Sequence, residues 1–321
     1  MTSKRWWIAV QLTFLGYVLW KFGVKVVDNW SELGVLRTRL HPVWWRVAAT
    51  GVPVLLSYAV LIETWRRTLR TWGARLPWSA AAQIWFVSNL GKYMPGKLWQ
   101  VAAMATLAQR HGVSPIAAVG SSLVVNLVNI VAGFALVALF GSARLAGAGF
   151  WPGLAVAALL IAGMPWLLPR ALRLAARLTK RDFPAVHIPM SALVLAFVGC
   201  SLAWMLYGYA FGSLAVAIFG LAAGTTALYT AVFTLSYLLG YVAVFAPGGI
   251  GVREKSLTSL LAVAGLESGP NATLLVIASR LWLTVLETVP GLLLLLNARR
   301  SRVPTEPIQL NGSETDGPVI G

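Results

Sequence analysis

The chain has 321 residues, of which 58% are hydrophobic and only 11% are charged, and its mean hydropathy is +0.74. This composition excludes a soluble globular protein and is typical of a polytopic membrane protein, because apolar runs of about 20 residues recur along most of the chain. The formal net charge of +16 is not accompanied by an RNA-binding aromatic motif or by zinc-ligand spacing, so nucleic acid is excluded as a partner. Basic residues of membrane proteins gather instead in cytoplasmic loops.

The first predicted transmembrane span runs from Trp6 to Val27. It follows Lys4 and Arg5 without a small-residue cleavage site, so we expect an uncleaved helix rather than a signal peptide. A second span is predicted over Trp44–Thr64, and a basic loop follows it. The arginines of that loop are Arg66, Arg67, Arg70 and Arg75.

Two short helical segments come next, Ser79–Tyr93 and Lys97–Arg110, with Pro95-Gly96 between them. Each has only about half the length that the hydrocarbon core requires, so together they predict a re-entrant helical hairpin. Full spans are then predicted over Pro115–Phe140, Phe150–Leu168 and Pro189–Phe219. The basic segment before the last of these predicts an amphipathic surface helix carrying Arg170, Arg173, Arg177, Lys180 and Arg181.

The same order of features returns near the C-terminus. Thr225–Phe245 leads into Pro247-Gly248-Gly249, Val252–Ala264 returns, and Asn271–Asn297 is the last predicted crossing. Paired broken apolar segments at corresponding places predict an internal repeat with a site between the copies. Three full spans separate the two predicted hairpins, and this odd number makes the repeat inverted. Thr225–Phe245 is itself long enough to cross the membrane, and the inversion fails if it does.

The predicted fold is therefore an all-α integral membrane protein with six transmembrane helices and two re-entrant hairpins in an inverted repeat. Residues 1–297 form one transmembrane domain, and residues 298–321 are expected to be a disordered tail because they are polar and carry three prolines. The distribution of Lys and Arg places both termini on the cytoplasmic side.

Both Pro-Gly breaks are followed by a predicted helix N-terminus, whose free N–H groups and positive dipole end suit an anion such as a lipid phosphate. Basic side chains add positive charge beside both breaks. The alternative interpretation is a structural kink with lysines that reach toward the membrane surface. The candidate substrate-binding residues of the breaks are Lys92, Pro95, Gly96, Lys97, Pro247, Gly248, Gly249, Gly251, Arg253 and Glu254.

Arg280 and Glu287 complete this candidate set from the last predicted span. They are seven residues apart and so share one helical face. An intramembrane arginine usually faces a partner or an aqueous pathway, and either Glu287 or Glu254 can be that partner. A structural ion pair is as good an interpretation as a role in substrate binding.

The sequence contains no GxSxG, HExxH or CxxC motif, so we expect no catalytic site and no enzyme activity. The single cysteine, Cys200, lies in an apolar run. Of only 10 acidic residues, three (Glu306, Glu314 and Asp316) fall in the polar tail, which leaves few carboxylates for a metal site. Neither a metal nor a cofactor is expected.

Two segments carry a resemblance to a known family: NLGKYMPGKLWQ (89–100), and FAPGGIGVREKSLTSLL (245–261) with the later SRLW (279–282). They resemble the flippase-like transmembrane domain of the lysylphosphatidylglycerol synthase family, over roughly Trp6–Asn297. The soluble aminoacyl-transferase domain of the bifunctional members is not found in the sequence, so aminoacyl transfer is not expected. The binding positions that the resemblance implies are Pro95, Gly96, Lys97, Pro247, Gly248, Gly249, Gly251, Arg253, Glu254 and Arg280.

The resemblance implies a bacterial or archaeal cytoplasmic-membrane protein that handles a lipid. The first hypothesis is a flippase or transporter that moves an anionic or headgroup-modified phospholipid, or a lipid-linked intermediate, between leaflets. The alternative is a non-transporting membrane scaffold for a lipid-modifying enzyme or a glycosyltransferase. Its basic surface helix, with Arg173 and Arg177, would then face that partner.

Overall fold

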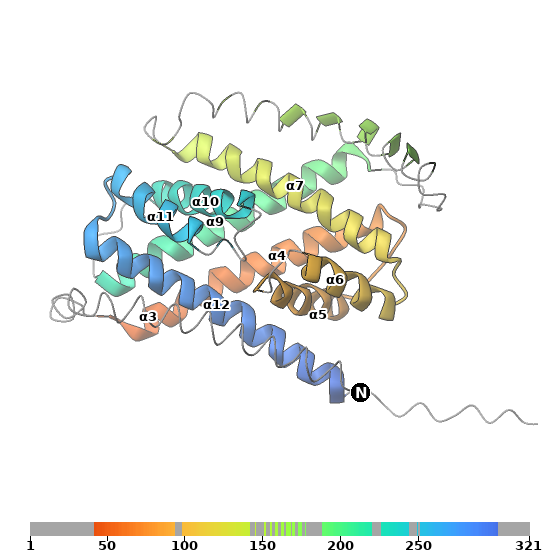
Figure 1. Cartoon of the computed structure of the whole chain (residues 1–321), viewed down its shortest axis with the longest axis horizontal. Helices are drawn as coiled ribbons and strands as arrows, with labels where there is room; N and C mark the ends of the chain where they lie inside the picture. The colour runs from red at the N-terminus through yellow and green to blue at the C-terminus, as the bar shows by residue number, and fades with distance from the viewer. Residues whose placement is uncertain are drawn as a thin grey trace, which may run out of the picture.

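The computed structural model describes residues 42–93, 98–141, 145, 188–219, 226–243, 249 and 251–300, and scattered helical positions between 151 and 177. All regular elements within these residues are helices (Figure 1). Four of them are long and apolar enough to cross a membrane, which confirms a multi-pass helical membrane protein. The predicted first span, Trp6–Val27, lies outside the described residues, and Phe150–Leu168 is described only in part.

The described elements occur twice in the order long, short, short, long. The first set is α3 (Trp44–Ala49) with α4 (Gly51–Arg70), α5 (Trp78–Asn89) with the short 3₁₀ helix η1 (Leu90–Tyr93), α6 (Leu98–Arg110) and α7 (Pro115–Phe140). The second set is α9 (Met190–Phe219), α10 (Thr226–Val242), α11 (Val252–Val263) and α12 (Gly269–Arg300). These bounds lie close to the predicted helices of both copies.

The turns after α6 and α11 have the same backbone structure. Gly112 and Gly265 have φ of +72° and +68°, the left-handed conformation that glycine adopts without a Cβ penalty. In each turn the N–H after the glycine donates a 3.0 Å bond to the carbonyl five residues earlier. This is the hydrogen bond of a Schellman cap, which satisfies carbonyls that the helix end leaves free. The second long helix of each set then begins within five residues.

The two short pairs occupy opposite halves of the elongated bundle, α5–α6 at the right and α10–α11 at the left of Figure 1. The α6–α7 turn lies at the right-hand end and the α11–α12 turn at the left-hand end. Helices α4 and α9 run antiparallel, since Val43, just before α3, donates a 3.1 Å hydrogen bond to Ala217 near the end of α9. The long helix α12 passes along both short pairs.

Glycines at the helix crossings allow close backbone approach. A Cβ added at Gly199 of α9 would overlap the hydroxyl of Thr64 on α4, and one at Gly208 would overlap Thr230 on α10. Small residues at such contacts are typical of helices that associate in lipid, where close van der Waals packing replaces the hydrophobic effect. The crossings therefore hold α9 against both α4 and α10.

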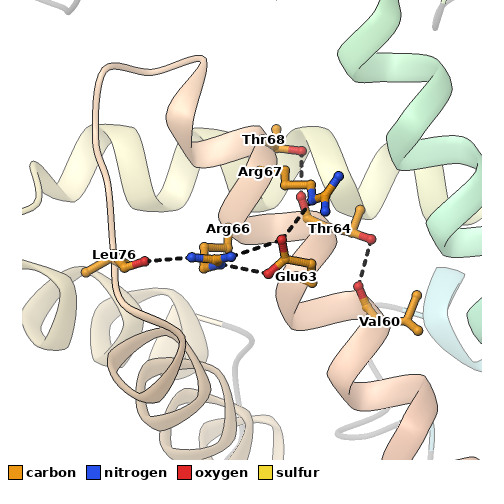
Figure 2. Close-up of polar contacts among 7 residues, drawn as sticks. All are labelled: Val60, Glu63, Thr64, Arg66, Arg67, Thr68 and Leu76. Carbon is orange, nitrogen blue, oxygen red and sulfur yellow. Dashed lines mark hydrogen bonds and ion pairs between the residues drawn. The ribbon is translucent and has the colours of Figure 1, made fainter.

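The predicted arginine loop is wrong in part, because α4 continues to Arg70. Trp65 and Leu69 are fully buried in this last stretch, so packing favours a continued helix. The Glu63 carboxylate also accepts bonds from Arg66 and Arg67, one turn further on (Figure 2). Such pairs stabilise helices by about 0.2–0.5 kcal/mol each.

Candidate functional site

The short helix α11 packs against α10 through its basic residue. Arg253 is 7% exposed and shares the buried face of α11 with Leu257 and Leu261, four and eight residues further on. The opposing position on α10 is Gly240, where an added Cβ would lie 2.9 Å from Arg253 Cβ. Because glycine stands there, the backbone of α10 lies close enough to enclose the arginine side chain.

The Arg253 guanidinium lies against aromatic rings. Its Cζ is 4.2 Å from the ring centroid of Tyr237 and 5.1 Å from that of Phe233, both on α10. Among the residues that the structure describes, Arg253 has no ion pair and no side-chain hydrogen bond. Glu254, Glu287 and Arg280 are near enough to interact with it electrostatically. The positive charge of Arg253 therefore contacts aromatic ring faces. Side chains of both positive and negative charge lie near it.

Glu254 connects the start of α11 to α12. One carboxylate oxygen accepts a 2.5 Å hydrogen bond from the N–H of Gly251, the residue that precedes the helix and has φ of +88°. The other lies 3.1 Å from Nε of Arg280, an ion pair in which the N–H is not aligned for a hydrogen bond, since this oxygen accepts none. The acidic residue therefore both caps α11 and neutralises an α12 cation.

The second carboxylate of the cluster, Glu287, lies two turns beyond Arg280 on the buried face of α12. It accepts a 2.5 Å hydrogen bond from the Tyr58 hydroxyl of α4. Tyr58 in turn packs edge-on against Tyr207 of α9, with ring centroids 5.8 Å apart. We call Arg253 and Glu254 of α11 with Arg280 and Glu287 of α12 the charged cluster. Helices α4, α9 and α10 supply the aromatic residues around it.

The aromatic lining was not predicted from the sequence. It consists of Tyr58, Tyr207, Phe233 and Tyr237, and the rings of Tyr207 and Phe233 stack at 6.0 Å and 21°. Isolated tyrosines in apolar spans have no distinctive spacing, and the hydrogen bond of Tyr58 joins residues 229 apart in the chain. The only available signal was a spacing of four between Phe233 and Tyr237, which places both rings on one helical face.

The first short pair has a related polar contact. Gln100 of α6 donates a 2.7 Å hydrogen bond to Asn89 at the end of α5. Gly91 provides the close approach, since an added Cβ would lie 2.8 Å from the Gln100 backbone nitrogen. Gly91 and Gln100 thus repeat the pairing of Gly240 with Arg253, but with a neutral amide. Helix α12 reaches this pair at Gly291, beside the Phe86 carbonyl.

The structure brings together four of the predicted site residues, which are those of the charged cluster. Gly249 and Gly251 lie at the edge of this cluster. Gly249 has φ of +71°, and an added Cβ would lie 3.1 Å from the Gly240 carbonyl oxygen. Lys92 lies in η1. Within the described residues, no three His, Cys, Asp or Glu side chains are placed to hold a metal ion. The predicted positions outside the described residues are Pro95, Gly96, Lys97, Pro247 and Gly248.

The cluster contains two cations and two carboxylates, and Arg253 is the cation that an anion can contact without displacing Glu254 from Arg280. Arg280 is already paired, and Arg253 presents a guanidinium that can bind two oxygens of a phosphate at once. The arrangement can therefore bind an anion.

Comparison with known proteins agrees with these features. A family model described as the lysylphosphatidylglycerol synthase TM region matches residues 6–291. None of the curated proteins compared with the chain matches it. Since the family match includes both short helix pairs and the charged cluster, the chain belongs to the family of lysylphosphatidylglycerol synthase transmembrane regions.

Proposed function

We propose that the protein moves an anionic or headgroup-modified phospholipid between the two leaflets, with the headgroup held at Arg253. The observation that carries this proposal is the environment of Arg253, a residue only 7% exposed whose guanidinium lies against ring faces and has no paired carboxylate among the described residues. Membership in a family named for a lipid synthase supports a lipid as the ligand.

The free energy of burying this cation argues for a ligand. Desolvation of an ion costs several kcal/mol even after relaxation, whereas a cation–π contact returns about 0.5–2 kcal/mol. Glu254 is already engaged by Arg280 and by Gly251, and Glu287 by Tyr58. A phosphate group would supply the missing counter-charge, which is a reason to retain such a costly residue.

The arrangement of the short helix pairs supports transport rather than simple binding. We infer that α5–α6 and α10–α11 are re-entrant hairpins that enter from opposite faces, with both termini cytoplasmic. Their following turns lie at opposite ends of the bundle (Figure 1), and α12 contacts one pair at Arg280 and the other at Gly291. Movement of one half against the other could then expose the headgroup to each leaflet in turn.

The test uses the purified full-length protein in liposomes that contain phosphatidylglycerol labelled on an acyl chain. A membrane-impermeant quencher measures the label exposed on the outside over time. We expect Arg253→Gln to slow equilibration at least about tenfold, because loss of a buried charged contact typically costs 2–5 kcal/mol. Arg253→Lys keeps the charge but not the planar fork and should give an intermediate rate.

Arg110→Gln is the matched control. Arg110 is exposed at the end of α6, and its substitution removes the same formal charge from another short helix. Its rate should equal that of the wild type. If wild type and Arg253→Gln equilibrate the lipid equally fast while both remain folded, as judged by size-exclusion chromatography, transport through this site is wrong.

A further inference from the structure

A second polar recess lies between α4 and α9, apart from the charged cluster. The two helices cross closely at Thr64 and Gly199 and leave a recess of about 240 Å³ beyond the crossing. Its α4 wall carries two hydroxyls and two guanidinium groups, and its α9 wall is apolar and made mainly of alanine. The lining residues that matter here are Thr64, Arg67, Thr68, Arg70, Ala192 and Leu195.

The charge of the recess is positive. Glu63 binds the side chains of both Arg66 and Arg67, at 2.7 Å each, and so neutralises one of three nearby arginines (Figure 2). Arg66 also donates to the Leu76 carbonyl, on the side of α4 away from Thr64. Arg67 uses only its Nε in these bonds. Its two terminal amino groups have no hydrogen-bond acceptor among the described residues, and its side chain is 51% exposed.

The position of the recess fits the membrane surface. Helix α4 has 20 residues and is therefore about 30 Å long, close to the thickness of the hydrocarbon core. Arg67 and Arg70 lie in its last turn, at the level where lipid phosphates lie.

An apolar stripe begins at the same recess and follows α9 toward the middle of the bundle. Leu195, Val198 and Leu202 are 43%, 56% and 41% exposed and lie three and four residues apart, so they share one face. The arginines of the recess match the phosphate of a phospholipid, and the apolar stripe matches an acyl chain. Free phosphate would complement only the arginines.

We propose that this recess binds one anionic phospholipid, with its phosphate on Arg67 and Arg70 and an acyl chain along Leu195, Val198 and Leu202. The site is distinct from the proposed transport site, because none of its residues belongs to the charged cluster. The bound lipid would fill the space where α4 and α9 separate and so fix the angle between them.

Native mass spectrometry of the full-length protein, released from nanodiscs of phosphatidylglycerol or of phosphatidylcholine, tests the proposal. We expect the wild type to retain one phosphatidylglycerol more than Arg67→Gln/Arg70→Gln does, and no phosphatidylcholine. Arg67→Gln/Arg70→Gln should lower retention roughly 30-fold, because each interfacial arginine contributes about fivefold to anionic-lipid binding. Arg110→Gln should retain the lipid as the wild type does.

Two further measurements separate this site from other sources of bound anion. Arg253→Gln should keep the phosphatidylglycerol of the recess. Loss of this lipid in Arg253→Gln, with retention in the Arg67/Arg70 double variant, would assign it to the charged cluster and overturn the proposal. Competition with excess glycerol 3-phosphate should not displace the lipid, because the acyl chain buries apolar area that this headgroup fragment lacks. Displacement by this headgroup fragment alone would overturn the acyl-chain part of the proposal.

Discussion

At the scale of single residues, Glu287 accepts a hydrogen bond from a buried tyrosine inside the bundle. The donor is Tyr58, which is 3% exposed, so water offers no replacement for its hydroxyl. A buried acceptor that loses its donor keeps its desolvation penalty, and this penalty exceeds the net value of the bond itself. The Tyr58 hydroxyl therefore contributes to the stability of the bundle at Glu287.

We predict that Tyr58→Phe lowers the free energy of unfolding by about 1–3 kcal/mol. The ring packing against Tyr207 is kept, so the change reports the hydroxyl alone. Unfolding by increasing SDS in mixed micelles measures the effect. In a double-mutant cycle, Tyr58→Phe in the background of Glu287→Leu should cost much less than in the wild type. Equal costs in the two backgrounds would show that the two side chains are not coupled.

Glu267 offers a residue-scale test outside the spans, in the turn between α11 and α12. Burial raises the pKa of this carboxyl, although a hydrogen bond from Asn271 acts in the opposite direction. One of its oxygens has no hydrogen-bond partner within the described part of the chain. Ionisation is thus less favourable in the folded than in the unfolded protein, so stability is highest below the unfolded pKa of about 4.3 and falls as the pH rises through the raised value.

We therefore predict that Glu267→Gln has a higher Tm than the wild type at pH 7.5 and the same Tm near pH 4. Thermal unfolding in detergent at both pH values measures the difference. Ser268→Asn is the control, since Ser268 is the exposed neighbour in the same turn. A difference between Glu267→Gln and wild type that does not change with pH would assign the effect to packing rather than to ionisation.

At the scale of elements, each short pair is closed by a glycine that faces the other arm. Gly91 lies against the backbone of Gln100, and Gly240 against the Cβ of Arg253. A methyl group at either position would force the arms apart, although alanine favours a helix by up to about 1 kcal/mol over glycine. At both positions alanine would thus improve helix propensity but worsen packing. Because the distances are short, we expect the packing effect on stability to be the larger one.

We predict that Gly91→Ala and Gly240→Ala each destabilise the protein by about 1–3 kcal/mol, the usual effect of overpacking. Gly212→Ala is the comparison with a smaller expected loss, because its added Cβ would lie 3.3 Å from the Tyr229 ring, a tight contact with a side chain and not an overlap with backbone or Cβ atoms. Thermal stability in detergent distinguishes the three. Gly240→Ala should also reduce lipid equilibration, since it displaces Arg253, and an unaltered rate with lowered stability would separate packing from function at this position.

The sequence predicted those elements whose limits are local. The Pro-Gly breaks and the capping glycines mark the ends of α5, α6, α10 and α11, because backbone geometry and helix length depend on neighbours in the chain. The helical end of α4 was not predicted, because the arginines in this stretch indicate an exposed loop. Trp65 and Leu69 are nevertheless buried there by tertiary packing, which the sequence does not show. The charged cluster was predicted from charges in apolar segments, whereas its tyrosines come from contacts far apart in sequence.

At the scale of the whole molecule, the chain builds two sets of helices in the same order and places their short pairs in opposite halves of the bundle. If the sets are inverted relative to each other, the two Schellman turns face opposite sides of the membrane. Charge supports this orientation: Arg66, Arg67 and Arg70 lie near the end of α4, at the same end of the bundle as the α6–α7 turn (Figure 1).

Cysteine labelling tests this arrangement directly. The natural Cys200 is buried, and Cys200→Ala gives a background with no cysteine. His111 and Ser268 are exposed in the two turns, so a cysteine at either position can react with an impermeant maleimide. In inside-out and right-side-out vesicles, we expect His111→Cys to react only from the cytoplasmic face and Ser268→Cys only from the opposite face. Reaction of both from one face would mean that α10 spans the membrane and that the sets are parallel. Arg253 could then still bind a lipid anion, but the two short pairs could not present it to the two leaflets by symmetric movements.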